Sequence, residues 1–176
     1  MINLSIKGRY QDTIISESDN GFVERTDLGW KNNQVQDSAL KILAHGLEKD
    51  GGNFTDYFPL THMAVGTGTP SSQPYTQELL ENEVERIQLP SFIYLDSDGN
   101  ELSPQVPSNK FKFVVTLGAA NASGHTLTEF GLVGGNTTED SDTGYLFNWV
   151  LHDPIEKTPL VTIERTIEIT INITRN

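Results

Sequence analysis

The chain has 176 residues, 24 acidic and 12 basic side chains, and a formal net charge of −12. This charge excludes the basic surface that nucleic-acid binding requires, and it disfavours binding to an anionic membrane. The chain contains no cysteine, which excludes disulfide frameworks, thiol catalysis and cysteine-based metal sites.

The first third of the chain predicts strands, a hairpin and one helix. Residues 2–6 alternate apolar and polar side chains, as a half-buried strand does. Two further strand segments flank Asn20-Gly21, a dipeptide that suits a tight hairpin turn. A helix is expected over residues 37–49, where leucines recur at helical spacing. These leucines are Leu40, Leu43 and Leu47.

Loops are expected to dominate residues 66–110. A short strand, Met63-Ala64-Val65, leads into Gly66-Thr67-Gly68-Thr69-Pro70. Residues 77–82 have the composition of a short helical turn. Residues 96–100, Asp-Ser-Asp-Gly-Asn, predict a second hairpin because turn-forming residues separate two apolar segments.

The last third predicts strands at 110–117, 126–133, 145–151 and 160–174, with an acidic loop over 134–144 and a turn over 153–159. The closing strand is the most regular of them: from Val161 to Ile173 the odd positions are aliphatic except Arg165, and the even positions are polar. A buried arginine there needs an acidic or carbonyl partner.

At roughly 3.3 Å per residue, the closing strand would span about 40 Å, which exceeds the length of an average strand. Its last residues extend beyond what a core needs, so Ile171 and Ile173 are candidates for docking on another subunit. Taken together, the elements predict a mainly β fold. We expect one domain over residues 1–176, an antiparallel β-sandwich with one early α-helix and long loops.

The sequence predicts no catalytic, cofactor or metal site. Asp96 to Glu101 resembles a calcium loop, but Gly99 comes one residue early and no helices flank it. The cluster of Glu139, Asp140 and Asp142 leaves an opportunistic cation as an alternative. The loop from Gly66 to Pro70 lacks the Lys-Ser/Thr of a phosphate site. Trp30 and Trp149 suit either sugar stacking or, for Trp149, the core. We therefore predict that the protein is not an enzyme and holds no cofactor.

Four sequence blocks occur in a fixed order: Trp30-Lys31-Asn32-Asn33, residues 63–70, residues 80–86 (Leu-Glu-Asn-Glu-Val-Glu-Arg) and residues 127–133 (Leu-Thr-Glu-Phe-Gly-Leu-Val). In this order they resemble a group of tailed-phage virion proteins that includes the N-terminal domain of phage tail-collar fibre proteins. The resemblance covers roughly residues 30–174 and is weakest at 91–110.

The residues that carry the resemblance are of types that shape and link parts of a fold. Glycines permit backbone conformations and close approaches that other residues do not. Glu83 and Arg86 are three apart and would pair on a helix; alternatively, Arg86 pairs with Glu129 and links two loops. The motif residues are Gly66, Gly68, Glu83, Arg86, Glu129 and Gly131.

The resemblance implies a non-enzymatic structural component of a phage particle, such as a tail, neck or baseplate adaptor or collar protein. Its expected partners are copies of itself, as a homo-oligomer, and neighbouring virion proteins. The chain stops at Asn176 without a fibre shaft, which indicates a free-standing component. It is expected in the virion after synthesis in the host bacterial cytoplasm. The alternatives are a capsid decoration (cement) protein and a carbohydrate-binding module for host-surface attachment.

Overall fold

A computed structural model describes residues 2–48, 60–135 and 137–175 of the chain. The elements of the first half are β1 (Ile2–Glu17), β2 (Val23–Val35), α1 (Ala39–Glu48), β3 (Leu60–Gly66), β4 (Glu83–Gln88) and β5 (Ile93–Tyr94). Those of the second half are β6 (Lys110–Leu117), β7 (His125–Gly134), β8 (Tyr145–Leu146), β9 (Asn148–Lys157) and β10 (Val161–Arg175). None of the helical residues described forms a segment long and apolar enough to cross a membrane.

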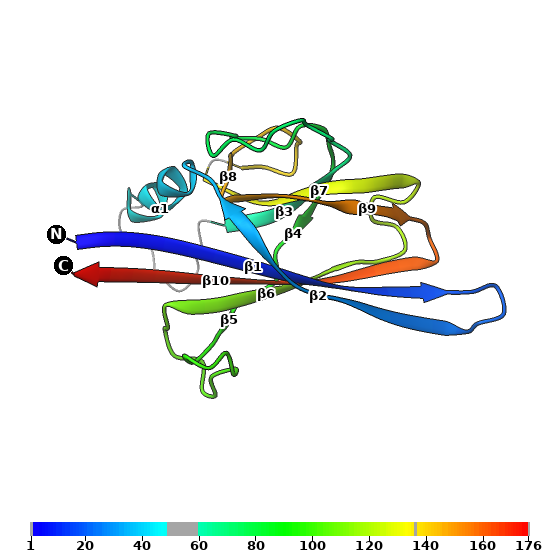
Figure 1. The fold of residues 1–176 in the computed structure, drawn as a ribbon, viewed down its shortest axis with the longest axis horizontal. Helices are drawn as coiled ribbons and strands as arrows, with labels where there is room; N and C mark the ends of the chain where they lie inside the picture. Colours follow the sequence, from blue (N-terminus) through cyan, green and yellow to red (C-terminus); the bar gives the residue numbers. More distant parts are fainter. Residues whose placement is uncertain (1, 49–59, 136, 176) are drawn as a thin grey trace.

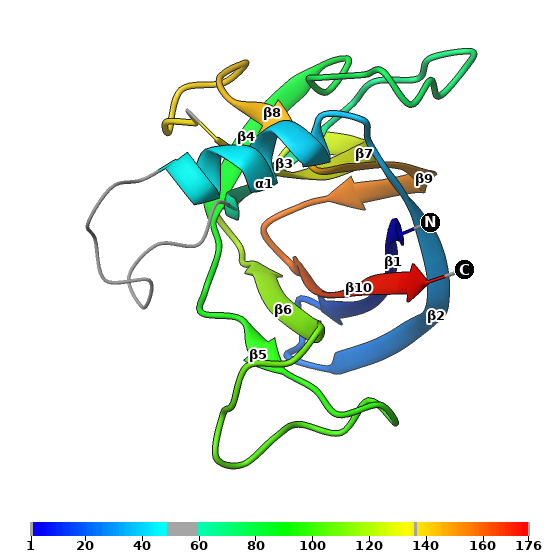
Figure 2. The same cartoon turned by 90° about the vertical axis from the view of Figure 1, so that its left-hand side faces the viewer.

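The strands form one antiparallel sheet that curls into two layers, with the order β4-β3-β7-β9-β2-β1-β10-β6-β5 and with β8 paired to β7. Strand β2 joins the layers: residues 23–33 pair with β1, whereas Gln34 and Val35 pair with β9. Figure 2 shows the curl, with α1 beside β8. The prediction of a mainly β, antiparallel fold with one early helix is confirmed.

The core lies between the two layers of the sheet. Phe113, Ile163 and Ile167 fill it from the layer of β10 and β6, and Met63 and Leu132 fill it from the layer of β3 and β7. A further contact across the layers joins the rings of Tyr10 and Phe130, whose centroids are 5.0 Å apart in an edge-to-face arrangement. Burial of these large side chains is the main stabilising contribution to such a fold.

Strands β1 and β10 pair along their whole length, from Ile2 opposite Arg175 to Ser16 opposite Val161. The closing strand predicted over 160–174 is therefore present. Its odd positions face the core over the central part of the strand, where Ile163, Ile167 and Ile169 are buried, whereas Ile173 near its end is exposed. Figure 1 places both chain ends at one end of the molecule and the β1–β2 turn at the opposite end.

Three local predictions differ from the structure. The apolar face predicted for α1 is wrong at Leu40, which is exposed, whereas Leu43 is half-buried and Ala39 and Ile42 are buried. The side chain of Leu47 and residue 49 lie outside the described residues. The short helical turn at 77–82 does not form. The turn predicted over 153–159 starts later, because β9 runs to Lys157 and its residues 155–157 pair with the start of β7 beyond a register shift.

Candidate functional site

The carboxylate of Glu129 lies at the centre of the motif residues. It points inward from β7 and is fully buried. Its Oε1 accepts the backbone N–H of Gly68 (3.0 Å) and of Asn82 (2.8 Å). Its Oε2 accepts the backbone N–H of Glu81 (3.1 Å) and the indole N–H of Trp149 (2.8 Å). Four donors thus satisfy one buried carboxylate, which fastens the loop after β3 and the segment before β4 onto β7.

The glycines of the motifs make room for this carboxylate. A Cβ at Gly66 would lie 2.6 Å from Oε1 of Glu129, and one at Gly68 would lie 2.6 Å from the Cβ of Glu81 and would overlap Oε1 as well. Gly131, two residues beyond Glu129 on β7, lies so close to β9 that a Cβ would come 2.5 Å from the carbonyl oxygen of Asn148. All three glycines allow close approach of backbone to neighbouring groups.

Arg86 pairs with Glu83, as one of the two hypotheses predicts, although both lie on strand β4 and not on a helix. The pair is bidentate, with Nη2 to Oε2 at 2.9 Å and a second bond from Nε to Oε1. Residues three apart on a regular strand point to opposite faces, so a regular strand would not bring these two side chains together. Strand β4 is irregular here, because its register against β3 shifts between Glu83 and Glu85. Both side chains are buried.

The remaining nitrogen of Arg86, Nη1, donates to Thr137 Oγ1 (2.6 Å) and Thr143 Oγ1 (2.9 Å). The pair therefore anchors the acidic loop to β4. The alternative contact between Arg86 and Glu129 does not form among the described residues, because the four bonds of Glu129 all come from other donors.

The arginine that interrupts the closing strand has the acidic partner that the sequence predicts. Arg165 and Asp12 form a buried bidentate pair, with both N–O distances at 2.7 Å. The guanidinium also stacks on Phe130, with Cζ 3.7 Å from the ring centroid. The partner lies 153 positions away in sequence, and only the β1–β10 register brings Asp12 opposite Arg165.

His152 lies beside this pair, with its Nε2 3.5 Å from Nη2 of Arg165 and its Nδ1 2.8 Å from the carbonyl oxygen of Asp153. Burial, and then the charge of Arg165, lower the pKa of His152 from 6.5 to about 4. The side chain is therefore neutral at neutral pH, and Nδ1 donates while Nε2 faces the guanidinium. Tyr10, Asp12 and His152 line one wall of a cavity of about 460 Å³.

The two loops considered as cation sites are held by hydrogen bonds within each loop. The carboxylate of Asp96 accepts the backbone N–H of Asp98 (2.9 Å) and of Asn100 (2.8 Å), which makes it the internal brace of the predicted hairpin turn. Across the described part of the chain, no group of three or more acidic or histidine side chains has the arrangement of a metal site. Glu139, Asp140 and Asp142 are exposed.

The two tryptophans differ in environment. Trp149 is buried in the core and is held by Glu129, so the sugar-stacking alternative does not apply to it. Trp30 is 42% exposed on β2, and the guanidinium of Arg9 covers its ring, with Cζ 4.2 Å from the centroid.

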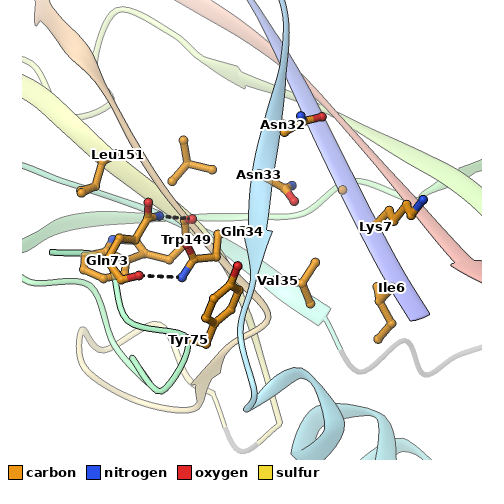
Figure 3. A pocket seen from close by; sticks show the side chains of 12 residues that line it. Ile6, Lys7, Asn32, Asn33, Gln34, Val35, Gln73, Tyr75, Trp149 and Leu151 are labelled. Carbon is orange, nitrogen blue, oxygen red and sulfur yellow. Dashed lines mark hydrogen bonds between the residues drawn. The ribbon is translucent and has the colours of Figure 1, made fainter. Parts of the chain in front are cut away.

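A groove of about 670 Å³ lies between β1, β2 and β9 (Figure 3). It is rich in side-chain amides, of which Gln34 donates to the carbonyl oxygen of Gln73 (2.9 Å) and Gln73 to that of Trp149 (2.6 Å). The amide of Asn33 has no partner among the described residues. The amides come from separate segments, so no local motif predicts this groove. They are Asn32, Asn33, Gln34 and Gln73, and Tyr75 adds an aromatic ring.

The two docking candidates on β10 differ in exposure. The backbone of both residues is paired with β1, Ile171 opposite Ile6 and Ile173 opposite Leu4. Ile171 packs against the edge of the core. Ile173 is 64% exposed and Leu4 is 49% exposed, so together they form an uncovered apolar pair at the end of the molecule that holds both chain ends.

Strand β2 has an open edge. Residues 23–33 pair with β1 on one side, and in the described structure no strand pairs with them on the other. The side chains of residues 17–32 are all exposed. An open edge of this length presents unpaired backbone groups on which another chain is able to add a strand.

Comparison of the chain with protein-family models, with curated proteins and with solved structures finds no match.

Proposed function

We propose that the chain is a non-enzymatic structural component of a phage particle. It would act as an adaptor or collar protein of the tail, neck or baseplate, by assembling with its own copies and docking to neighbouring virion proteins. The observation that carries the proposal is the long β1–β2 hairpin, with its open β2 edge and its exposed side chains from residue 17 to residue 32. Soluble proteins usually cover or shorten such edges, so a long open one favours an assembly contact.

The arrangement of the motif residues agrees with a structural role. Glu129 and the Glu83–Arg86 pair are buried, and their bonding groups are used to hold loops against the sheet. Gly66 and Gly68 are needed for that packing.

Fractionation of lysates from cells that produce the chain together with phage particles tests the proposal. Phage particles are separated from free protein on a density gradient, and the chain is measured in each fraction with an antibody raised against the purified protein. The proposal predicts that the chain co-sediments with particles and resists washing in high salt. A chain found only among the free proteins, with other virion proteins in the particle fractions, would contradict it. A capsid decoration protein differs only in location, so separating capsids from tails decides between the two.

A carbohydrate-binding module is the second candidate, because the groove of about 670 Å³ offers several side-chain amides and the exposed ring of Tyr75. Amides and aromatic rings are the groups that bind sugar hydroxyls and sugar faces. A glycan array tests it: binding that is lost in both Asn32→Ala and Tyr75→Ala, and kept in the control Val106→Ala, an exposed residue of another loop, would favour this candidate. Absence of binding to any bacterial surface glycan would reject it.

A further inference from the structure

The β1–β2 hairpin ends in an acidic tip, residues 17–24, that projects from the molecule at the end opposite the chain termini (Figure 1). The hairpin tip carries Glu17, Asp19 and Glu24, all exposed and without a cation in ion-pair reach among the described residues. Beside these acids Phe22 is 67% exposed and Val23 is 56% exposed. An exposed phenylalanine among unpaired carboxylates has the composition of a docking element.

Hydrogen bonds within the hairpin tip hold it in one conformation. The backbone N–H of Ser18 donates to the carbonyl oxygen of Phe22 (2.9 Å), and that of Gly21 donates to Ser18 (2.8 Å). The side chain of Asn20 accepts the backbone N–H of Phe22 (3.2 Å). Gly21 takes the positive φ, 78°, that such a turn needs. A preformed tip loses little conformational entropy when it binds.

At the middle of β1, around residues 7–9, a basic hollow of about 260 Å³ lies on the outer face of the same sheet. Lys7, Arg9 and Lys110 line it, together with Glu168. Glu168 lies 2.7 Å from Arg9 and 3.8 Å from Lys110, whereas Lys7 has no ion partner among the described residues. Three cations against one carboxylate stand out on a chain whose net charge is −12.

We propose that the hairpin tip of one copy docks in the basic hollow of the next copy. The two surfaces have opposite charge, and the exposed ring of Trp30, which Arg9 covers, lies close to the hollow and offers an apolar contact for Phe22. The hollow lies near the middle of β1 and the tip follows the end of that strand, so at roughly 3.3 Å per residue the stretch from Arg9 to Glu17 holds them about 25 Å apart, and a single chain is unable to join them. The contact is therefore head-to-tail, and its repetition gives a ring or a filament. The inference rests on the self-assembly part of the proposed function and names its surfaces.

Sedimentation velocity of the purified chain at about 1–100 μM tests the inference. The hollow variant is Lys7→Gln/Lys110→Gln, and its control, with the same loss of charge elsewhere, is Lys31→Gln/Lys41→Gln. The tip variant is Asp19→Asn/Phe22→Ser, and its control is Asp98→Asn/Val106→Ser, which alters an exposed acid and an exposed apolar residue in another loop. Thermal unfolding establishes that each variant is folded.

Wild type is expected to form oligomers that 0.5 M salt weakens. Loss of two exposed ion pairs should raise the dissociation constant roughly 2- to 30-fold, and loss of Phe22 with Asp19 should raise it more than about 10-fold. The controls should behave as wild type. The decisive step is to mix the tip variant with the hollow variant. Each keeps one intact surface, so the mixture should form capped heterodimers of two chains, whereas each variant alone should associate less than the mixture at the same total concentration.

A second readout uses the absence of cysteine from the chain. Chains that carry both Lys7→Cys and Asp19→Cys should give a ladder of disulfide-linked multimers on mild oxidation, and Asp98→Cys with Lys7→Cys should not. A monomeric wild type, association that both variants leave intact, or a mixture without heterodimers would overturn the inference. A monomeric chain that still co-sediments with particles would overturn the inference but not the proposed role in the particle. An oligomer that depends on both surfaces but is absent from particles would support the inference and contradict the proposed role.

Discussion

The buried carboxylate of Glu129 makes a strong prediction about stability. Replacement by glutamine keeps the shape of the side chain but leaves one acceptor oxygen where there were two, and turns an amide nitrogen toward two N–H donors. All four bonds lie between 2.8 and 3.1 Å, so two charge-assisted hydrogen bonds are lost. Each lost bond to a charged acceptor costs about 1.5–3 kcal/mol. The cost is reduced here because the N–H groups of Glu81 and Asn82 are only part-buried. We therefore expect Glu129→Gln to lower the free energy of unfolding by about 2–4 kcal/mol.

Urea and thermal unfolding measure this loss. For a chain of this size 1 kcal/mol corresponds to about 2–4 °C in Tm, so the expected fall is about 4–16 °C. The control Glu139→Gln removes an exposed carboxylate of the acidic loop and should stay within about 0.5 kcal/mol of wild type. Trp149 fluorescence provides a local readout, because its indole N–H loses its acceptor. If Glu129→Gln unfolds within about 2 °C of its control, the carboxylate does not fasten the loop.

Three further predictions concern the same interior. Gly68→Ala pushes a Cβ into Glu129 and should cost about 1–3 kcal/mol in urea unfolding, unless the loop shifts without loss. Asp12→Ala leaves a buried guanidinium unpaired and should cost about 3–5 kcal/mol, whereas Asp12→Leu/Arg165→Met should recover most of that loss; a double variant as unstable as the single one would count against a buried ion pair. Because burial and Arg165 lower the pKa of His152 to about 4, the unfolded chain binds a proton more readily than the folded chain, and the stability present above pH 6.5 falls by about 3 kcal/mol as the pH drops to 4. His152→Gln should remove most of that pH dependence in urea titrations, and parallel pH profiles for variant and wild type would contradict it.

Local alternation was enough to predict strands that keep one face on the core over most of their length. The closing strand is the clearest case, because β1 covers one edge of β10 throughout and the core covers its odd-numbered face as far as Ile171. The register of long-range pairing lies beyond local patterns. The sequence predicts that Arg165 needs an acidic partner, yet only the pairing of β10 with β1 selects Asp12.

The other predictions that failed also depend on contacts with segments that are distant in the sequence. On α1 the leucine spacing predicts the wrong buried face, because the position of the sheet, and not the most apolar stripe, decides that Ile42 is covered. A turn is predicted over 153–159, but β9 continues to Lys157 because residues 155–157 still pair with β7. The cluster around Glu129 joins residues from four separate segments, so the sequence singles out Gly68 and Glu129 but not the contacts that Glu81, Asn82 and Trp149 make with this carboxylate.

Electron microscopy of gold-labelled particles tests the central claim most directly, that this chain is a self-assembled structural part of a phage particle. Antibody fragments against the purified protein are applied to intact particles, and the gold positions are averaged along the particle axis. The account predicts labels at one fixed position of the tail, neck or baseplate, in the several copies that a head-to-tail ring supplies. Particles that contain no copy of the chain, or labels scattered without a fixed position, would contradict it.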